Sequence, residues 1–308
     1  MKTLFKRDIS TILNLDYGGV QLVQFQPDPK GVKVITFARR GWSDKGADAN
    51  HARRDGPFTD MENVRQTFHA LLDANGIKRR KIDLLLPDCS ARISLLELNS
   101  LPDKREELFQ LVYLKGQKSP PYRFEDTRIG VQVLSGKGDT GKRRVLAVFT
   151  SRAFIEGLER VLGDLGMEPG RIGLATLNLY NLFEGELNRE EDTVFVAVFK
   201  DFFSVFLFSH GSPVFFRSKP LNVSERGLFF ELKASLLYYL NQDAAFRLQR
   251  VLFWKTGEIS NVAAWLEELS AVKPSMLKSR FPLEIRQGLS ATPEEMMSLT
   301  PAIGMVIK

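Results

Sequence analysis

Four consecutive residues, Asp16, Tyr17, Gly18 and Gly19, form the first pattern that could do chemistry. They separate two apolar stretches, TILNL and VQLVQF, whose alternation is typical of paired strands. An acidic residue followed by glycines in such a hairpin can clamp a phosphate, because glycine lets the backbone approach the anion closely. The same residues also suit an ordinary tight turn, so the pattern alone leaves both interpretations open.

A second candidate is the segment GKGDTGK, residues 136–142, which begins like a phosphate-binding loop. In such a loop a hydroxyl group after the lysine holds magnesium, and a helix N-terminus points at the phosphate. Here Arg143 follows Lys142, and the next residues, RVLAVF, predict a strand and not a helix. We therefore expect an exposed hairpin loop without a bound phosphate.

Other familiar sites are not indicated by the sequence. The three histidines, His51, His69 and His210, are scattered, and no cluster has metal-ligand spacing. The sequence contains no nucleophile elbow of the G-x-S-x-G type. The single cysteine, Cys89, excludes an intramolecular disulfide and is expected to be an inert, partly buried thiol at a strand end.

The composition is that of a globular protein with ample core material. The chain has 308 residues, of which 44% are hydrophobic and 26% charged, and its net charge is +6. Two or more lobes are expected at this length. We expect no signal peptide, because the N-terminal MKTLFKRD has no apolar core long enough for one. We expect no membrane helix, because the longest apolar run, TVFVAVF, falls far short of the roughly 20 residues that span a bilayer.

Periodicity predicts two halves that each open with a meander of strands. In the first half, strands are expected around the hairpin and over residues 31–42, then a loop over 43–56. A helix over residues 59–77 follows, which Thr59 would cap and Gly76 would end. Strand and helix patterns alternate from residue 91 to 166, and a strand then runs into a helix over 171–187. The second meander occupies residues 193–221, followed by a helix over 226–242, a strand over 247–257 and a helix over 261–271.

The order of these parts resembles the PilM family, actin-like proteins of type IV pilus assembly that are similar to the cell-division protein FtsA. LNLDYGGVQLVQF resembles the first phosphate hairpin of that family, GSPVFFRSKPL its second-half hairpin and TPAIGMVIK its closing segment. Residues 84–134, beginning LLLPD, resemble its strand, LP turn, helix and following strand. Residues 145–174 resemble the strand and helix that come next.

The departures from the family pattern concern the nucleotide loops. The first hairpin is about two residues short, and Gln21 stands where a lysine is common. The second phosphate loop reads VFKDFFS without a glycine, and the adenosine loop reads LFWKTGEIS, in which Gly257 alone remains. Phe202, Phe203 and Trp254 are expected to fill the space that a nucleotide needs. Asp16, Gly18, Gly19 and Gly257 are thus candidates for a vestigial nucleotide site.

The resemblance implies an α/β fold of the duplicated, ribonuclease H-like actin type with two lobes and a small inserted α/β module. The expected boundaries are residues 1–87 with 167–190 for the first lobe, 88–166 for the module and 191–308 for the second lobe. The expected function is that of a cytoplasmic scaffold, not an enzyme, in a type IV pilus or type II secretion inner-membrane platform. No cofactor or metal is expected, although ATP with Mg²⁺ remains an alternative.

The partner implied by the resemblance is the cytosolic tail of a membrane protein that spans the inner membrane once. Leu86, Pro87, Arg92 and Ile93 are the candidate docking residues, beside the basic run at residues 78–81. The protein would lie at the inner membrane only through that partner, would bind no nucleic acid, and could form a homo-oligomer. The alternatives are a nucleotide-binding actin-like ATPase, a sugar-kinase-like enzyme or an FtsA-like division protein. The last anchors through an amphipathic C-terminal helix, for which GMVIK is too short.

Overall fold

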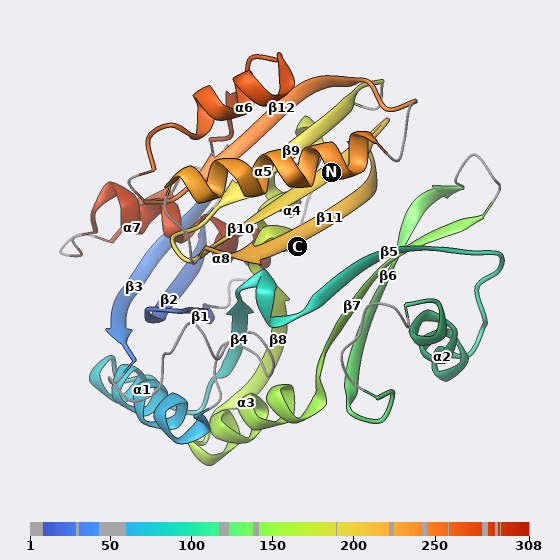
Figure 1. Ribbon diagram of the computed structural model, residues 1–308. Coiled ribbons are helices and arrows are strands. Elements are labelled where there is room, and N and C mark those ends of the chain that lie inside the picture. The colour runs from blue at the N-terminus through green and yellow to red at the C-terminus, as the bar shows by residue number, and fades with distance from the viewer. Residues whose placement is uncertain are drawn as a thin grey trace. The chain divides into compact units, whose positions relative to one another are not determined.

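In the computed structural model (Figure 1) the chain folds into two compact units. The first unit comprises residues 1–87, 156–185 and 278–308, and the second comprises residues 88–155 and 186–277. The residues that the structure describes are 9–28, 31–42, 60–116, 123–137, 142–188, 190–221, 225–241, 245–257, 259–278, 283–286, 289 and 291–307. The loop expected over residues 43–56 lies outside them. None of the described helices is long and apolar enough to cross a membrane.

The first unit is built on a six-stranded sheet with the order β14-β3-β2-β1-β4-β8. Strands β1, β2 and β3 form an antiparallel meander, whereas β4 runs parallel to β1 and β8 runs parallel to β4. The central residues of β1, β2 and β4 are buried on both faces, which explains the continuous apolar runs of these three strands. The bounds are β1 Ser10–Asp16, β2 Gly19–Asp28, β3 Gly31–Gly41, β4 Lys81–Leu86, β8 Glu168–Leu174 and β14 Leu283–Ile285.

Helices α1 and α4 carry the apolar faces that pack in the first unit. Helix α1 begins after Asp60, whose carboxylate accepts hydrogen bonds from the backbone N–H groups of Glu62 and Asn63 at 3.1 Å each. The expected cap at Thr59 is therefore wrong, and the Asp60 side chain one position later caps the helix instead. The bounds are α1 Met61–Ala74, α3 Arg152–Asp164, α4 Ala175–Phe183, α7 Pro293–Ser298 and α8 Thr300–Ile307.

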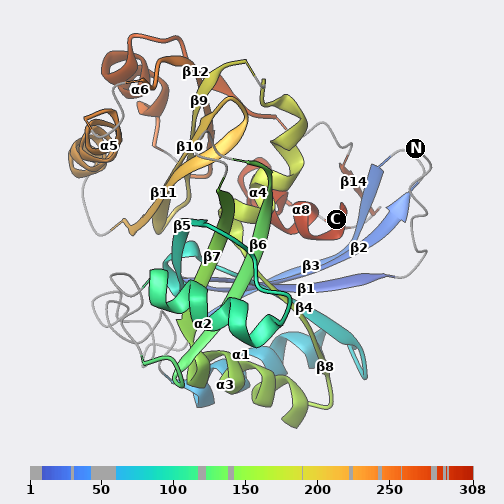
Figure 2. The same ribbon diagram turned by 90° about the vertical axis from the view of Figure 1, so that its right-hand side faces the viewer.

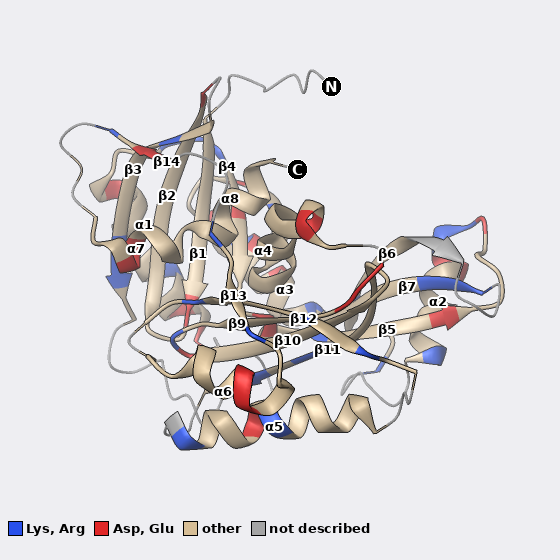
Figure 3. Ribbon diagram, turned by 90° about the horizontal axis from the view of Figure 1, so that it is seen from above, with Lys and Arg blue, Asp and Glu red and all other residues tan. Residues whose placement is uncertain are grey.

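The second unit repeats the strand order of the first. Its five-stranded sheet has the order β11-β10-β9-β12-β13, again an antiparallel meander with a parallel strand next to the first strand. Helices α5 and α6 cover one face of this sheet (Figure 3) over a core that includes Val196, Phe203, Leu228, Leu232 and Leu266. The bounds are β9 Asp192–Val198, β10 Phe202–Ser209, β11 Ser212–Pro220, α5 Glu225–Leu240, β12 Leu248–Lys255, α6 Val262–Ser270 and β13 Ser275–Met276.

The second unit also contains a separate three-stranded sheet, β5-β7-β6, with helix α2 packed against it (Figure 2). The short helix η2, Asp88–Ser90, precedes it and is anchored where the Asp88 carboxylate accepts a 2.6 Å hydrogen bond from Ser204 on β10. Both residues are fully buried. This sheet belongs to the segment that the sequence marks as an insertion. The bounds are β5 Arg92–Leu98, α2 Arg105–Lys115, β6 Thr127–Lys137 and β7 Arg143–Ser151.

The C-terminal residues do not belong to the unit in which the expected lobe boundaries place them. Residues 278–308 join the first unit, because β14 pairs with β3 and the buried helix α8 packs on α4. At Gly304 an added Cβ would lie 1.9 Å from the carbonyl oxygen of Asn178, so only glycine permits this close helix contact. The apolar tail TPAIGMVIK thus completes the first unit, although the sequence order suggested the second lobe.

Candidate nucleotide site

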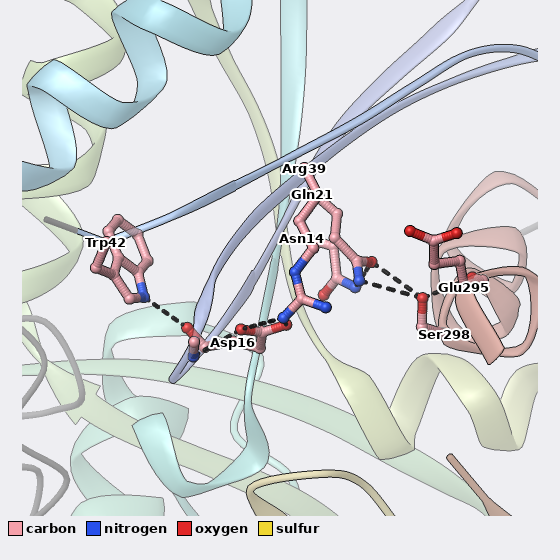
Figure 4. A network of polar contacts seen from close by, with 8 residues as sticks. Asn14, Asp16, Gln21, Arg39, Trp42, Glu295 and Ser298 are labelled. Atoms are coloured by element: carbon pink, nitrogen blue, oxygen red, sulfur yellow. Dashed lines mark hydrogen bonds and ion pairs between the residues drawn. The ribbon is translucent and has the colours of Figure 1, made fainter. Parts of the chain in front are cut away.

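The hairpin between β1 and β2 places Asp16 and Gly19 on either side of a two-residue turn that contains Gly18. Asp16 pairs with Gly19 across the hairpin, so Tyr17 and Gly18 alone connect the strands. The Asp16 carboxylate accepts a hydrogen bond from the Gly18 N–H at 2.7 Å and forms an ion pair with the Arg39 guanidinium at 3.1 Å (Figure 4). The Arg39 guanidinium therefore already balances the negative charge of Asp16, which would otherwise face a cation or a phosphate-bound water.

Residues at the end of β3 close this turn from the neighbouring strand. Because β3 pairs with β2, Arg39 lies opposite Gln21, and Trp42 follows directly after the strand. The Trp42 indole N–H donates to the backbone carbonyl of Asp16 at 2.8 Å. Neither Arg39 nor Trp42 was predicted from the sequence to lie at this turn. The antiparallel register of the ARRGW segment was the signal that could have revealed them.

Close packing of β2 on β3 accounts for Gly19. A Cβ added to Gly19 would lie 2.2 Å from the carbonyl oxygen of Arg40, which is closer than real Cβ atoms approach an oxygen. At Gly18 the nearest atoms would be 3.3 Å away, on Arg39 and Asp16. Gly19 is thus explained by the fold itself, without a phosphate, whereas the contacts at Gly18 are with side chains that can move.

A neutral network occupies the neighbouring position, where the family commonly has a lysine. Gln21 is 2% exposed, and its amide accepts from Asn14 at 3.0 Å and donates to Ser298 of α7 at 3.1 Å. All three groups are uncharged, so they offer no cation to a phosphate. The network instead connects the first hairpin to α7 within the same unit (Figure 4).

The corresponding turn of the second unit is filled with aromatic rings. The N–H of Phe199 donates to the carbonyl of Phe202 at 2.8 Å, which closes a tight turn between β9 and β10. The rings of Phe199 and Phe202 stack with centroids 4.1 Å apart, and Trp254 of β12 lies 4.9 Å from Phe199. Trp254 and Phe202 are almost fully buried. This aromatic cluster, Phe199, Phe202 and Trp254, fills the turn with bulky side chains.

Phe203 does not belong to the aromatic cluster, contrary to our expectation. Successive side chains on a strand point to opposite faces, so Phe203 packs with Leu228 and Leu232 beneath α5. Gly257, the remaining candidate, follows β12 with a left-handed φ of 84°, a conformation that favours glycine at the end of the strand. It lies in the second unit, whereas Asp16, Gly18 and Gly19 lie in the first.

The four candidate docking residues differ in their exposure. Leu86 and Ile93 are buried in strands β4 and β5, and Pro87 is buried as well. Only Arg92 presents an exposed side chain. Leu86 and Pro87 fall in the first unit, and Arg92 and Ile93 fall in the second.

The GKGDTGK segment connects two strands and not a strand to a helix. Lys137 of β6 pairs with Arg143 of β7 in an antiparallel ladder, while residues 138–141 lie outside the described part. The predicted hairpin is confirmed. Cys89 is partly buried, with its sulfur 3.2 Å from the Ser218 hydroxyl, and no group of metal-ligating side chains occurs among the described residues.

Strand order, duplication and full-length similarity define the protein as a two-lobe member of the actin-like fold class. Among solved structures, the chain is similar to a chain of the PilM–PilN type IV pilus biogenesis complex, with a TM-score of 0.75 and 15% identity over 98% of each chain. The predicted actin-like, PilM-like fold is thereby confirmed.

Two further structures agree with this fold, although no protein-family model and no curated protein matches the sequence. A Bacteroides thetaiotaomicron protein with an actin-like ATPase fold and unknown function has a TM-score of 0.57 and 14% identity, over 98% of this chain and 99% of that one. The cytoplasmic domain of EpsL, an inner-membrane component of the Vibrio cholerae type II secretion system, has a TM-score of 0.53 and 12% identity, over 98% and 96%.

Proposed function

We propose that the protein is an actin-like scaffold in the inner-membrane platform of a type IV pilus or type II secretion system. It holds the cytosolic tail of a membrane partner and does not hydrolyse ATP. The observation that carries this proposal is the similarity to a chain of the PilM–PilN complex along nearly the whole length. The similarity to the EpsL cytoplasmic domain points to the same kind of machine.

The two turns support the absence of ATP hydrolysis. Asp16 is already paired with Arg39, and the aromatic cluster occupies the second turn. A hydrolysing site needs positioned donors or a metal ion to stabilise charge on the transferred phosphoryl group. The described residues contain no group of metal ligands, and Gln21 is neutral.

The module around Arg92 is the proposed docking region for the tail. An extended tail could add to a strand edge, where backbone hydrogen bonds give affinity and a few side chains give specificity. Strands β5 and β6 are both edges of the three-stranded sheet. Because Leu86, Pro87 and Ile93 are buried, Arg92 is the side chain to test directly.

The test uses labelled peptides of the cytosolic tails of the single-span membrane proteins encoded beside this gene, with binding read by fluorescence anisotropy. Arg92→Glu should weaken binding of an acidic tail by about tenfold, whereas Lys115→Glu, an equally exposed control on α2, should not. Arg92 pairs with Phe149, so a short glycine–serine linker can replace residues 92–149. That variant should fold, because the module has its own core, and should lose the tail.

Two results would contradict the proposal. One is that no tail binds the intact protein. The other is that the linker variant folds, by circular dichroism and thermal melting, and binds the tail with unchanged affinity.

A further inference from the structure

Helix α5 is apolar on two opposite faces, which is unusual for a helix at a protein surface. Its inner face packs on the sheet of the second unit through Leu228, Leu232, Leu236 and Tyr239, all buried. A helix with apolar side chains all round is normally covered on every side. The outer face of α5 has no such cover within the described residues.

The outer face exposes large apolar side chains in one stripe. Phe230 is 52% exposed, Leu237 46% and Tyr238 54%, and these are three of the seven large exposed hydrophobic residues in the described part of the chain. Their spacing of seven and eight residues places them on one side of the helix, with exposed Ala234 between them. The stripe therefore forms one continuous apolar surface along α5.

The charges that accompany this stripe are positive. The Arg226 guanidinium lies over the Phe230 ring, 5.8 Å from its centroid, and Lys233 is exposed one turn further along. The flanking acid, Glu231, is bound by Lys219 at 2.6 Å and lies 3.7 Å from Arg217. The outer face thus combines aromatic and aliphatic side chains with basic groups that have no ion pair to another described residue.

A second copy of the chain fits this face poorly. The exposed portions of the three side chains amount to roughly 300 Å², given the 150–250 Å² that an aromatic side chain can bury. A stable interface needs roughly 800 Å² per partner. A twofold axis near the middle of α5 would also set Lys233 against the same lysine of the copy, and such like-charge contacts oppose association.

We propose that the outer face of α5 docks on an anionic lipid bilayer. Aromatic and leucine side chains that enter the headgroup region, beside basic groups that attract anionic headgroups, are the composition of interfacial helices. This goes beyond the expectation that a partner alone connects the protein to the membrane. It is also independent of tail docking, because it requires no partner.

The experiment is sedimentation of the full chain with vesicles, at about 0.1 M salt, of phosphatidylcholine alone or with about one third phosphatidylglycerol. The protein should sediment with the anionic vesicles and much less with the neutral ones. The triple variant Phe230→Ser, Leu237→Ser, Tyr238→Ser should lower the partition coefficient at least about tenfold. Arg226→Gln with Lys233→Gln should lower it roughly fivefold per residue and remove the preference for anionic lipid.

Matched controls sit elsewhere on the surface. Leu114→Ser with Val133→Ser removes two other exposed apolar side chains, and Lys115→Gln with Lys273→Gln removes two other exposed charges. Both controls should bind as the unchanged protein does. Absence of binding to anionic vesicles, or equal losses in the controls, would overturn the proposal. So would sedimentation velocity without lipid, if it shows a dimer that the triple variant abolishes, because a second copy would then cover the face.

Discussion

The turn between β1 and β2 and the turn between β9 and β10 occupy the same place in two sheets of the same strand order, yet they are filled in opposite ways. The first is closed by polar contacts, with Asp16 held by Arg39 and by the Gly18 N–H. The second is closed by the stacked rings of Phe199 and Phe202 against Trp254. Duplicated backbones can therefore keep their geometry while their side chains take on different tasks.

The polar contacts of the first turn and the aromatic cluster of the second should contribute differently to the free energy of unfolding. The Asp16–Arg39 pair is partly exposed, with 24% and 34% of the side chains accessible, and solvent screens such pairs. The rings of the aromatic cluster are largely buried, and burial of apolar surface is the dominant stabilising contribution in a fold. We therefore expect the second turn to be more important for stability and to be the greater obstacle to a nucleotide.

The largest effect is expected for Trp254→Ala. Loss of a fully buried indole leaves a cavity beside Phe199 and should lower the free energy of unfolding by about 3–5 kcal/mol, measured by urea denaturation. The matched change in the first turn, Trp42→Ala, removes a half-buried ring and one hydrogen bond and should cost clearly less. Equal losses for the two variants would contradict the proposed difference between the turns.

An intermediate effect is expected for Gly19→Ala. The new Cβ would meet the Arg40 carbonyl, so β2 and β3 must separate locally, at a cost of about 1–3 kcal/mol in thermal or urea unfolding. Gly163→Ala in α3 is the control, because nothing lies within 4 Å of its added Cβ. It should be neutral or stabilising by up to about 1 kcal/mol. If Gly19→Ala were also neutral, packing would not explain this glycine.

A small effect is expected for Arg39→Gln, which removes the cation from Asp16. A partly exposed ion pair contributes about 0–1 kcal/mol, so the variant should unfold at nearly the same denaturant concentration. Arg40→Gln, an equally exposed neighbour on β3, controls for the change in net charge. ATP binding restored by Arg39→Gln alone would show that the first turn, and not the aromatic cluster, is the obstacle.

The smallest effect is expected for Lys142→Ala in the GKGDTGK segment. Lys142 lies 4.0 Å from Glu97 and is 43% exposed, so stability should change by no more than about 0.5 kcal/mol. Tail binding should also be unchanged in the anisotropy assay. A large loss of either would reveal a site in this hairpin.

Much of the fold follows from local sequence patterns. The two strand meanders and the helices α1, α2, α3 and α6 were predicted from periodicity, whereas the duplicated fold was implied by the family resemblance. The C-terminal segment was expected in the second lobe but belongs to the first unit. The pairing of β14 with β3 and the contact of Gly304 with Asn178 place it there, and both join residues far apart in sequence. Periodicity within a segment carries no information about such partners.

The candidate site was predicted only in part for the same reason. Asp16, Gly18 and Gly19 were found because they lie within four consecutive residues, and the bulk of Phe202 and Trp254 was visible in the sequence. Arg39 reaches Asp16 only through the register of β2 on β3, and Phe199 joins the cluster through a tight turn. Phe203 was misplaced because the face that a strand residue occupies depends on which helix covers the sheet.

The central claim is that the fold has kept the two turns of an actin-like protein without keeping a nucleotide site. Isothermal titration calorimetry of the unchanged protein with ATP and Mg²⁺ tests it most directly. We expect no binding tighter than about 1 mM, and no change when Asp16 is replaced by Ala. A micromolar affinity that is lost in Asp16→Ala would contradict it.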